Sequence, residues 1–279
     1  MVQPSLFGSS TEPPPKPASD DAVRMRALIT VKAAPTPSES YGETVCVAAL
    51  RLDSARPTWV RLYPINFRAL SQDDQFKKYD VVTVDAVPAR QDQRRESWKP
   101  RLHTLVRELH LPPWSRRRPW LDPMVEDSMC RLNRAARADP HAQSLALIRP
   151  REITRLEITP HPGWTPDQQQ KIAAYANQPD LFDPGGRTPL AAPRLRGTYH
   201  YRCFDRRCRG HRQGMRDWEF VAEQRRLAHL GDRALAAALR RKFLSTMCDP
   251  SRDVAFYVGN QAKRPWVFSV LGVYYPRRW

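Results

Sequence analysis

The sequence predicts an α+β protein in which a small β-barrel-like or curved-sheet module comes first and a mixed α/β module follows. Three observations support this prediction. Segments rich in β-branched and aromatic residues fill the early part of the chain, helical periodicity appears only after them, and the C-terminal end alternates like a β-hairpin. A hydrophobic content of 41% across 279 residues is enough for one large or two modest cores.

The first module is expected over residues 23–123, after a polar, Pro-rich tail at 1–22 that we expect to be disordered. Its strand-like runs are separated by turn-forming Pro and Ser residues, and residues 59–63 alternate as in a sheet with one wet face. So many short strands in so short a segment indicate a small barrel or strongly curved sheet. The runs lie at 27–31, 43–52, 58–63 and 79–87, with a short helix near 67–76.

Residues 90–123 interleave arginines with tryptophans, which is what a surface that follows phosphates and stacks on bases requires. Arg94 and Arg95 could clamp a phosphate between them. The alternative is a solvated loop whose tryptophans anchor it to the core. Pro112, Pro113 and Pro119 favour a loop in either case.

A connecting region is expected over 124–186. It starts with a helix at 124–137 and continues as strand, turn and strand over 145–158. A second helix begins at Thr165, which can cap it, and ends near 178–179. The run 183–186 reads Asp-Pro-Gly-Gly and predicts a linker there.

The last module, residues 187–279, should contain a strand at 199–203, a Cys/His loop, a long helix and a terminal β-hairpin. The helix is expected over 217–247 with an interruption at Gly231, and one of its faces carries several arginines. The hairpin strands are expected at 254–258 and 266–275, joined near Asn260 and Gln261. Asn in such a turn is typical of turn chemistry, although Asn or Gln could also read adenine.

Four nitrogen and sulfur ligands stand close together in this module, at His200, Cys203, Cys208 and His211. Zinc in structural sites takes four such ligands in a tetrahedron, so the segment predicts a structural zinc site with no position left for a catalytic water. Residues three apart on a strand point to opposite faces, which argues against His200, and Cys248 could replace it. The alternative is that the cysteines are ordinary reduced thiols.

Three carboxylates lie in or just after the same segment of the sequence, at Asp205, Asp217 and Glu219. Nucleases hold Mg²⁺ with two or three carboxylates, so a metal-dependent nuclease is the alternative function. A competing interpretation is that Asp217 caps the following helix and Glu219 lies in its first turn. No Walker, dinucleotide or H-E-x-x-H motif is present.

The net charge of +17 predicts a polyanionic partner, and nucleic acid is the leading expectation, with DNA and RNA undistinguished. A third hypothesis is a basic protein-interaction subunit of a larger assembly. No apolar run approaches the roughly 20 residues of a membrane span, and the N-terminus does not resemble a secretion signal, so no membrane partner and a cytoplasmic location are expected. The residues expected to contact nucleic acid are Arg94, Arg95, Trp98, Arg116, Arg117, Arg118, Trp120, Arg225, Arg226, Arg240 and Arg241.

Overall fold

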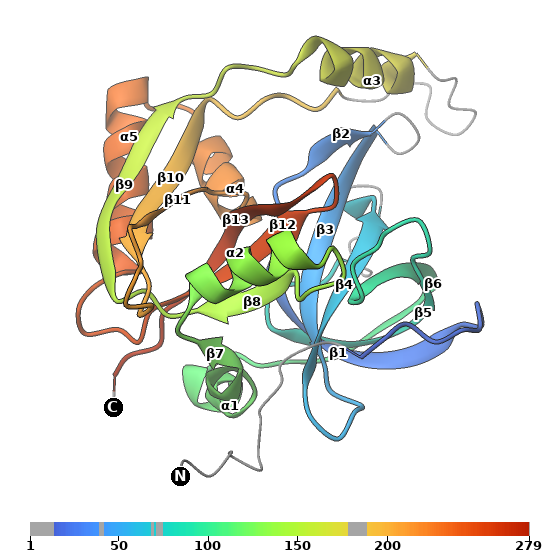
Figure 1. The fold of residues 1–279 in the computed structure, drawn as a ribbon. Coiled ribbons are helices and arrows are strands. Elements are labelled where there is room, and N and C mark those ends of the chain that lie inside the picture. The colour runs from blue at the N-terminus through green and yellow to red at the C-terminus, as the bar shows by residue number, and fades with distance from the viewer. Residues whose placement is uncertain (1–13, 39–41, 68–69, 71–74, 178–188, 279) are drawn as a thin grey trace, which may run out of the picture.

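The computed structural model of the protein describes residues 14–38, 42–67, 70, 75–177 and 189–278. Part of the expected tail, most of the expected helix at 67–76 and the linker at 183–186 therefore lie outside the described residues. The fold is α+β, as the sequence predicts, with a closed barrel first and a mixed sheet region with few helices after it (Figure 1).

The N-terminal module is a closed five-stranded barrel, which confirms the expected barrel or curved sheet. Three successive antiparallel strands are followed by a fourth that returns beside the first, which is a Greek key. The last strand closes the barrel by pairing antiparallel with the fourth and parallel with the third. The strands are β1 (Val23–Lys32), β3 (Gly42–Arg51), β4 (Thr58–Ile65), β5 (Asp80–Pro88) and β6 (Ser97–His110), with the short β2 (Thr36–Ser38) beside β3.

Side chains on the two faces of the barrel strands contribute to two different hydrophobic cores. On β1, Met25, Ala27 and Ile29 fill the barrel interior, whereas Leu28 and Val31 belong to a second core outside it. Both faces of the strand are buried, which explains why the sequence there is continuously apolar.

The outer face of β4 is buried at Trp59 and Arg61, contrary to the expectation of a solvent-exposed face over residues 59–63, and is exposed at Tyr63. Arg61 is 3% exposed, and the Trp59 ring meets the Tyr257 ring edge-on at 6.4 Å. The C-terminal hairpin supplies Tyr257, so the second module covers this side of the barrel.

Residues 90–123 are more ordered than the expected loop. Residues 97–110 form β6, whose register with β5 places Trp98 opposite Pro88 and packs it into the barrel core. Residues 97–110 form a strand rather than a loop because they pair with both β4 and β5 in the barrel. The chain then continues as α1 (Trp114–Leu121) and the short helix η2 (Asp122–Met124).

The second module contains two sheets and a small set of helices around one large core. A four-stranded sheet has the order β13-β12-β8-β7 and includes the expected terminal hairpin, while a three-stranded sheet has the order β11-β10-β9. The strands are β7 (Val125–Glu126), β8 (Leu145–Ile148), β9 (Glu152–Pro160), β10 (Leu195–Arg202), β11 (His211–Gly214), β12 (Ala255–Gln261) and β13 (Arg264–Tyr274). The helices are α2 (Met129–Ala138), α3 (Pro166–Ala176), α4 (Trp218–Arg226), α5 (Asp232–Arg240) and the π-helical η3 (Arg241–Thr246).

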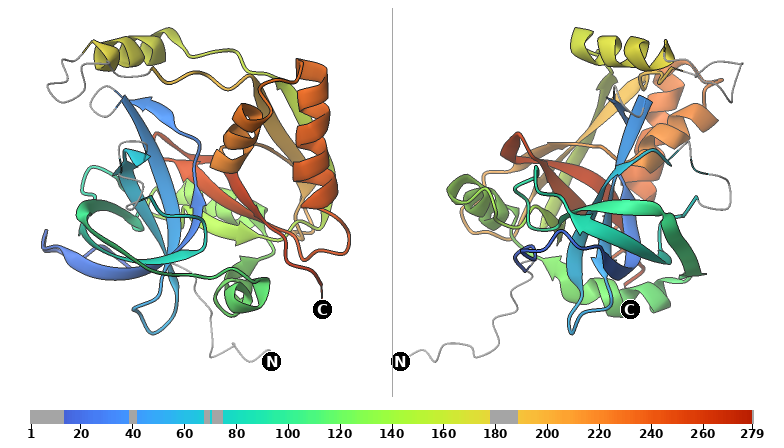
Figure 2. Two further views of the ribbon diagram at one scale, coloured as in Figure 1. Left: turned by 180° about the vertical axis from the view of Figure 1, so that it is seen from behind. Right: turned by 90° about the vertical axis from the view of Figure 1, so that its right-hand side faces the viewer.

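Local capping explains where these helices begin. Thr165 forms a capping box with Gln168 at the start of α3, which lies against β2 (Figure 2). Gly231 is the N-cap of α5 and separates it from α4, as expected. The predicted long helix is therefore two α-helices and a π-helical turn.

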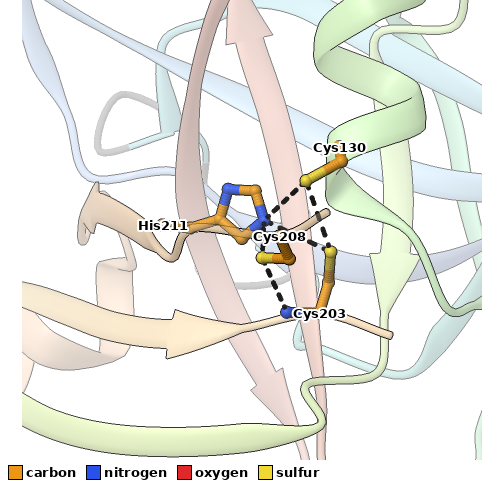
Figure 3. Close-up of side chains that lie close together, drawn as sticks. All are labelled: Cys130, Cys203, Cys208 and His211. Atoms are coloured by element: carbon orange, nitrogen blue, oxygen red, sulfur yellow. Dashed lines mark hydrogen bonds between the residues drawn. The ribbon is translucent and has the colours of Figure 1, made fainter. Parts of the chain in front are cut away.

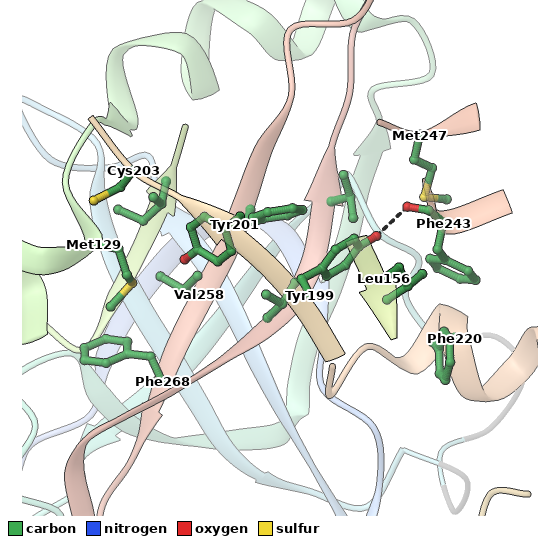
Figure 4. Packing of buried hydrophobic residues seen from close by; sticks show 14 of the residues in the cluster. Met129, Leu156, Tyr199, Tyr201, Cys203, Phe220, Phe243, Met247, Val258 and Phe268 are labelled. Carbon is green, nitrogen blue, oxygen red and sulfur yellow. Dashed lines mark hydrogen bonds between the residues drawn. The ribbon is translucent and has the colours of Figure 1, made fainter. Parts of the chain in front are cut away.

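The core of the second module is aromatic. Tyr199 and Tyr201 of β10 pack against Phe256 of β12, and Phe220 of α4 packs against Phe243 of η3 (Figure 4). The Tyr199 hydroxyl donates a hydrogen bond to the Phe243 carbonyl oxygen, which joins the sheet to the helices. Within the described residues, no helix is long and apolar enough to cross a membrane.

Candidate metal centre

Four side chains converge at the end of the β10–β11 hairpin. Cys203 follows β10, Cys208 lies in the connecting loop, His211 begins β11, and Cys130 comes from the first turn of α2 (Figure 3). Their ligand atoms all lie within 4.8 Å of one another. The His211 Nε2 atom lies 3.3 Å from the Sγ atoms of Cys203 and Cys208 and 3.6 Å from the Cys130 Sγ atom.

Backbone geometry shapes the loop so that its ligands face inward. The Asp205 carbonyl oxygen accepts from the Cys208 amide, and the Cys208 Sγ atom accepts from the Cys203 amide at 3.4 Å. Gly210 has a φ of 107°, which is strained for any residue with a Cβ. That turn lets His211 re-enter the sheet beside Tyr201.

The carboxylate of Asp205 ties α2 to the same loop. Its Oδ2 atom accepts a hydrogen bond from Arg134 at 2.9 Å and from the Ser128 hydroxyl at 3.4 Å. Ser128 also caps α2 by accepting from the Arg131 amide. These contacts hold the helix where Cys130 reaches the loop.

His200 is not a member of the group, which differs from the set expected from sequence. Its Nε2 atom is paired with Glu157 on β9 at 2.9 Å, on the outer face of the sheet. Strand alternation sends the His200 and Cys203 side chains apart, and Cys130 fills the fourth place. Cys248, the other candidate, instead contacts the Phe243 carbonyl oxygen through its Sγ atom.

The arrangement fits a tetrahedral metal ion. With zinc–sulfur bonds of about 2.3 Å and zinc–nitrogen bonds of about 2.0 Å, a tetrahedron has edges of roughly 3.5–3.8 Å. The Cys130 and Cys203 Sγ atoms are 3.7 Å apart, and the sulfur–nitrogen distances are 3.3–3.6 Å. A metal ion can therefore be held here by residues already in place.

The imidazole of the group is in the ionisation state that a metal ligand needs, and the Cys130 thiol is not. Burial and the adjacent Cys203 thiol raise the pKa of Cys130 to about 12, and burial lowers the pKa of His211. The imidazole is thus neutral at physiological pH, as a ligand must be, whereas the Cys130 thiol is protonated and has to release its proton when a metal binds.

Family comparisons divide the chain at the boundary between the barrel and the second module. Residues 125–279 match a family described as Domain of unknown function (DUF8757), and residues 23–123 match Domain of unknown function (DUF8758). The chain belongs to the DUF8757 family. A search of curated proteins found no match. All four residues of the metal group lie within the DUF8757 segment.

The three carboxylates proposed for a nuclease do not form a metal site. Among the described residues, the Cys/His group of the DUF8757 segment is the sole cluster of three or more such donors close enough to hold an ion. Asp217 is 4% exposed and accepts from the Glu219 amide as the N-cap of α4, so the capping interpretation is confirmed. Glu219 lies 3.6 Å from the Lys78 ammonium, and Asp205 is paired with Arg134.

Several of the arginines and tryptophans expected to meet nucleic acid have structural partners. Arg94 is buried and donates to Asp92 and to the Asn260 carbonyl oxygen. Trp98 is packed in the barrel core, and the half-buried Trp120 packs against the second core. Arg117 stacks on the Tyr79 ring at 3.9 Å, and Arg118 is bonded to Asp122 and Asp253. In the DUF8757 segment Arg226 pairs with Glu223. Arg95 is half-buried, and the exposed members of the set are Arg116, Arg225, Arg226, Arg240 and Arg241.

Cys130 is the ligand that sequence reasoning missed. It lies 73 residues before Cys203, in an amphipathic helix. A cysteine in such a helix is usually an ordinary, partly buried residue, so nothing nearby in the sequence marks Cys130 as a ligand. The only signal in the sequence was the odd number of cysteines, five, because it argues against disulfide pairing and leaves Cys130 as one of the free thiols that could bind a metal.

Proposed function

We propose that the protein binds nucleic acid and that its second module is built around a structural zinc ion held by Cys130, Cys203, Cys208 and His211. The zinc proposal rests on the 3.3–3.6 Å distances from the His211 Nε2 atom to the three Sγ atoms and on the 3.7 Å distance between the Cys130 and Cys203 Sγ atoms, all close to the edges of a zinc tetrahedron. Three thiolates and one imidazole favour zinc over magnesium or calcium, which prefer oxygen ligands.

The role proposed for the ion is structural. Four protein ligands complete the tetrahedron and leave no open position for water or substrate. The ligands come from α2 and from the β10–β11 hairpin, so an ion joins two segments that the chain separates widely. Binding energy at such a site contributes directly to folding.

The zinc proposal is tested on the purified, reduced protein. Elemental analysis is expected to find one zinc per chain, and a strong chelator is expected to lower the melting temperature. Added Zn²⁺ should restore it, while Mg²⁺ should not. A protein that is free of zinc and melts at the same temperature with and without chelator contradicts the proposal.

Nucleic-acid binding is supported by charge and by architecture together. A net charge of +17 attracts phosphate backbones, and five-stranded Greek-key barrels of the OB type bind oligonucleotides. A direct measurement tests this proposal.

That measurement is binding of labelled single- and double-stranded DNA and RNA at about 150 mM salt, with Mg²⁺ or with EDTA. Retarded and intact nucleic acid whose affinity falls steeply with salt is the expected outcome. Cleavage that requires Mg²⁺ would replace this proposal by a nuclease. Failure to bind any of the four substrates would leave the protein-interaction hypothesis.

A further inference from the structure

Two adjoining cavities run between the barrel and the terminal hairpin. The first, about 510 Å³, is bounded by β3 and β4, by the loops after β1 and β5, and by the tip of β12 and β13. The second, about 320 Å³, continues beneath β10 toward Trp164. The two share Ala34, Thr36, Arg216, Gln261 and Ser269 as lining residues, so they form one groove.

The groove is positively charged. None of the described residues that line either cavity is Asp or Glu, although the chain contains 29 acidic residues. Of the acids next to the lining, Asp92 is bonded to Arg94, and Glu96 accepts a hydrogen bond from the Ser144 amide. The cations that line the groove are Arg61, Arg94, Arg196, Arg216 and Lys263.

Arg61 carries a buried charge whose hydrogen bonds go to neutral groups. Its side chain, on β4, donates from Nη1 to the Cys46 Sγ atom at 3.1 Å and from Nη2 to the Ser144 hydroxyl at 3.0 Å. The Nε atom is buried and has no hydrogen-bond partner. Buried charges are normally paired, so a guanidinium held without a carboxylate indicates that another anion completes the site.

Arg216 lies at the junction of the two cavities and lines both. Its backbone bonds to Ala34 and Val270, and among the described residues no carboxylate is paired with its exposed side chain. Nearby, the Oδ1 atom of Asn260 is buried without a donor. That oxygen could accept a hydrogen bond from the edge of a nucleotide base.

Aromatic rings flank the cations. Tyr63, at the mouth of the first cavity, is 42% exposed, and Trp164 lines the second beside the His161 ring at 5.6 Å. Cations that contact phosphates, together with rings on which bases stack, are the combination found in proteins that bind single strands.

We propose that this groove, defined by Arg61, Tyr63, Trp164, Arg216 and Lys263, binds single-stranded nucleic acid through its phosphates and bases. The inference rests on the proposed nucleic-acid-binding function and specifies its site and its substrate class. A duplex presents its bases stacked and paired, so it cannot place them against Tyr63 and Trp164.

The test compares charge reversals inside and outside the groove. Arg216→Glu and Lys263→Glu alter the lining, and Arg56→Glu makes the same change at an exposed site in the β3–β4 turn, at the opposite end of those strands. Fluorescence anisotropy with labelled single strands of about 12 nucleotides and matched duplexes reports affinity. Lys263 is exposed in a turn, so Lys263→Glu should fold normally. The groove proposal can then still be tested if Arg216→Glu is unstable.

We expect both groove variants to weaken single-strand binding at least about 10-fold and Arg56→Glu to change it less than about 2-fold. Neutral Arg216→Gln should reduce the salt slope by about 0.7. Equal effects of the three reversals, or tighter binding of duplex than of single strand by the wild type, overturn the groove proposal. A wild type that binds no nucleic acid instead refutes the proposed function itself.

Discussion

The Sγ atoms of Cys130 and Cys203 lie 3.7 Å apart, although 73 residues separate them in the chain. One belongs to a helix that follows the barrel, and the other ends a strand of the three-stranded sheet. The metal ion that we propose for this site would account for the meeting of two thiols from such distant segments. The identity of the ligands can be tested separately from the presence of zinc.

Cys130→Ser should lose zinc and lower the melting temperature by roughly 10 °C or more, because a three-ligand site no longer supports folding. His200→Ala is the matched comparison, since His200 is paired with Glu157 on the outer face of the sheet. It should retain one zinc per chain. The reverse result, with zinc lost in His200→Ala and kept in Cys130→Ser, would restore the ligand set expected from sequence.

Gly272 of the hairpin packs closely against Val31 of the barrel strand β1. A Cβ there would lie 2.7 Å from the Val31 Cγ1 atom, and Val is β-branched and cannot turn aside. Gly272→Ala should therefore cost about 1–3 kcal/mol in the free energy of unfolding measured by denaturant titration.

Gly214→Ala is the control for that experiment. Gly214 is an exposed residue on an edge strand, and an added Cβ would meet nothing within 4 Å. Its effect should stay within about 0.5 kcal/mol. Similar costs at the two glycines would show that the hairpin does not pack tightly on β1.

Asp217 should make stability depend on pH in the neutral range. Burial, reinforced by the negative charge of Glu219, raises the pKa of Asp217 from 3.8 to about 7. The folded state then holds a proton that the unfolded state has released, so this contribution to stability is largest below pH 3.8 and is lost as the pH rises to about 7.

Asp217→Asn removes the titration and keeps a good helix cap. Between pH 5 and 7 the wild type should lose stability relative to the variant, measured as the difference of their melting temperatures. Parallel curves for the two proteins would mean that Asp217 is ionised throughout, stabilised by Lys78.

Tyr199→Phe should destabilise the protein by about 1 kcal/mol while leaving its zinc content unchanged. The lost hydroxyl donates to the Phe243 carbonyl oxygen inside the π-helical turn η3, where the Cys248 thiol is the other donor. Thermal unfolding monitored by circular dichroism measures the cost. An unaltered melting temperature would indicate that the Cys248 thiol alone satisfies this carbonyl.

Local pattern was sufficient for much of the fold. The strand-rich start, the terminal hairpin, the break at Gly231 and the caps at Thr165 and Asp217 all depend on residues adjacent in sequence. Propensity, alternation and capping act over a few residues, so they can be identified without knowing the tertiary structure. For the same reason three ligands of the metal centre could be named.

The remaining features depend on contacts between distant segments. Trp98 faces the barrel core because β6 pairs with β5 on one side and β4 on the other, and Arg61 is buried because the hairpin covers β4.

The sequence by itself determined the fold class and the chemistry available to the protein: a strand-rich basic chain with cysteines and histidines in one loop. Only the tertiary structure decided that Cys130 completes the Cys/His group and that, among the described residues, Arg61 and Arg216 face the groove without a carboxylate partner. Both depend on which surfaces meet when the modules pack, and burial is a property of the assembled chain rather than of any segment in it.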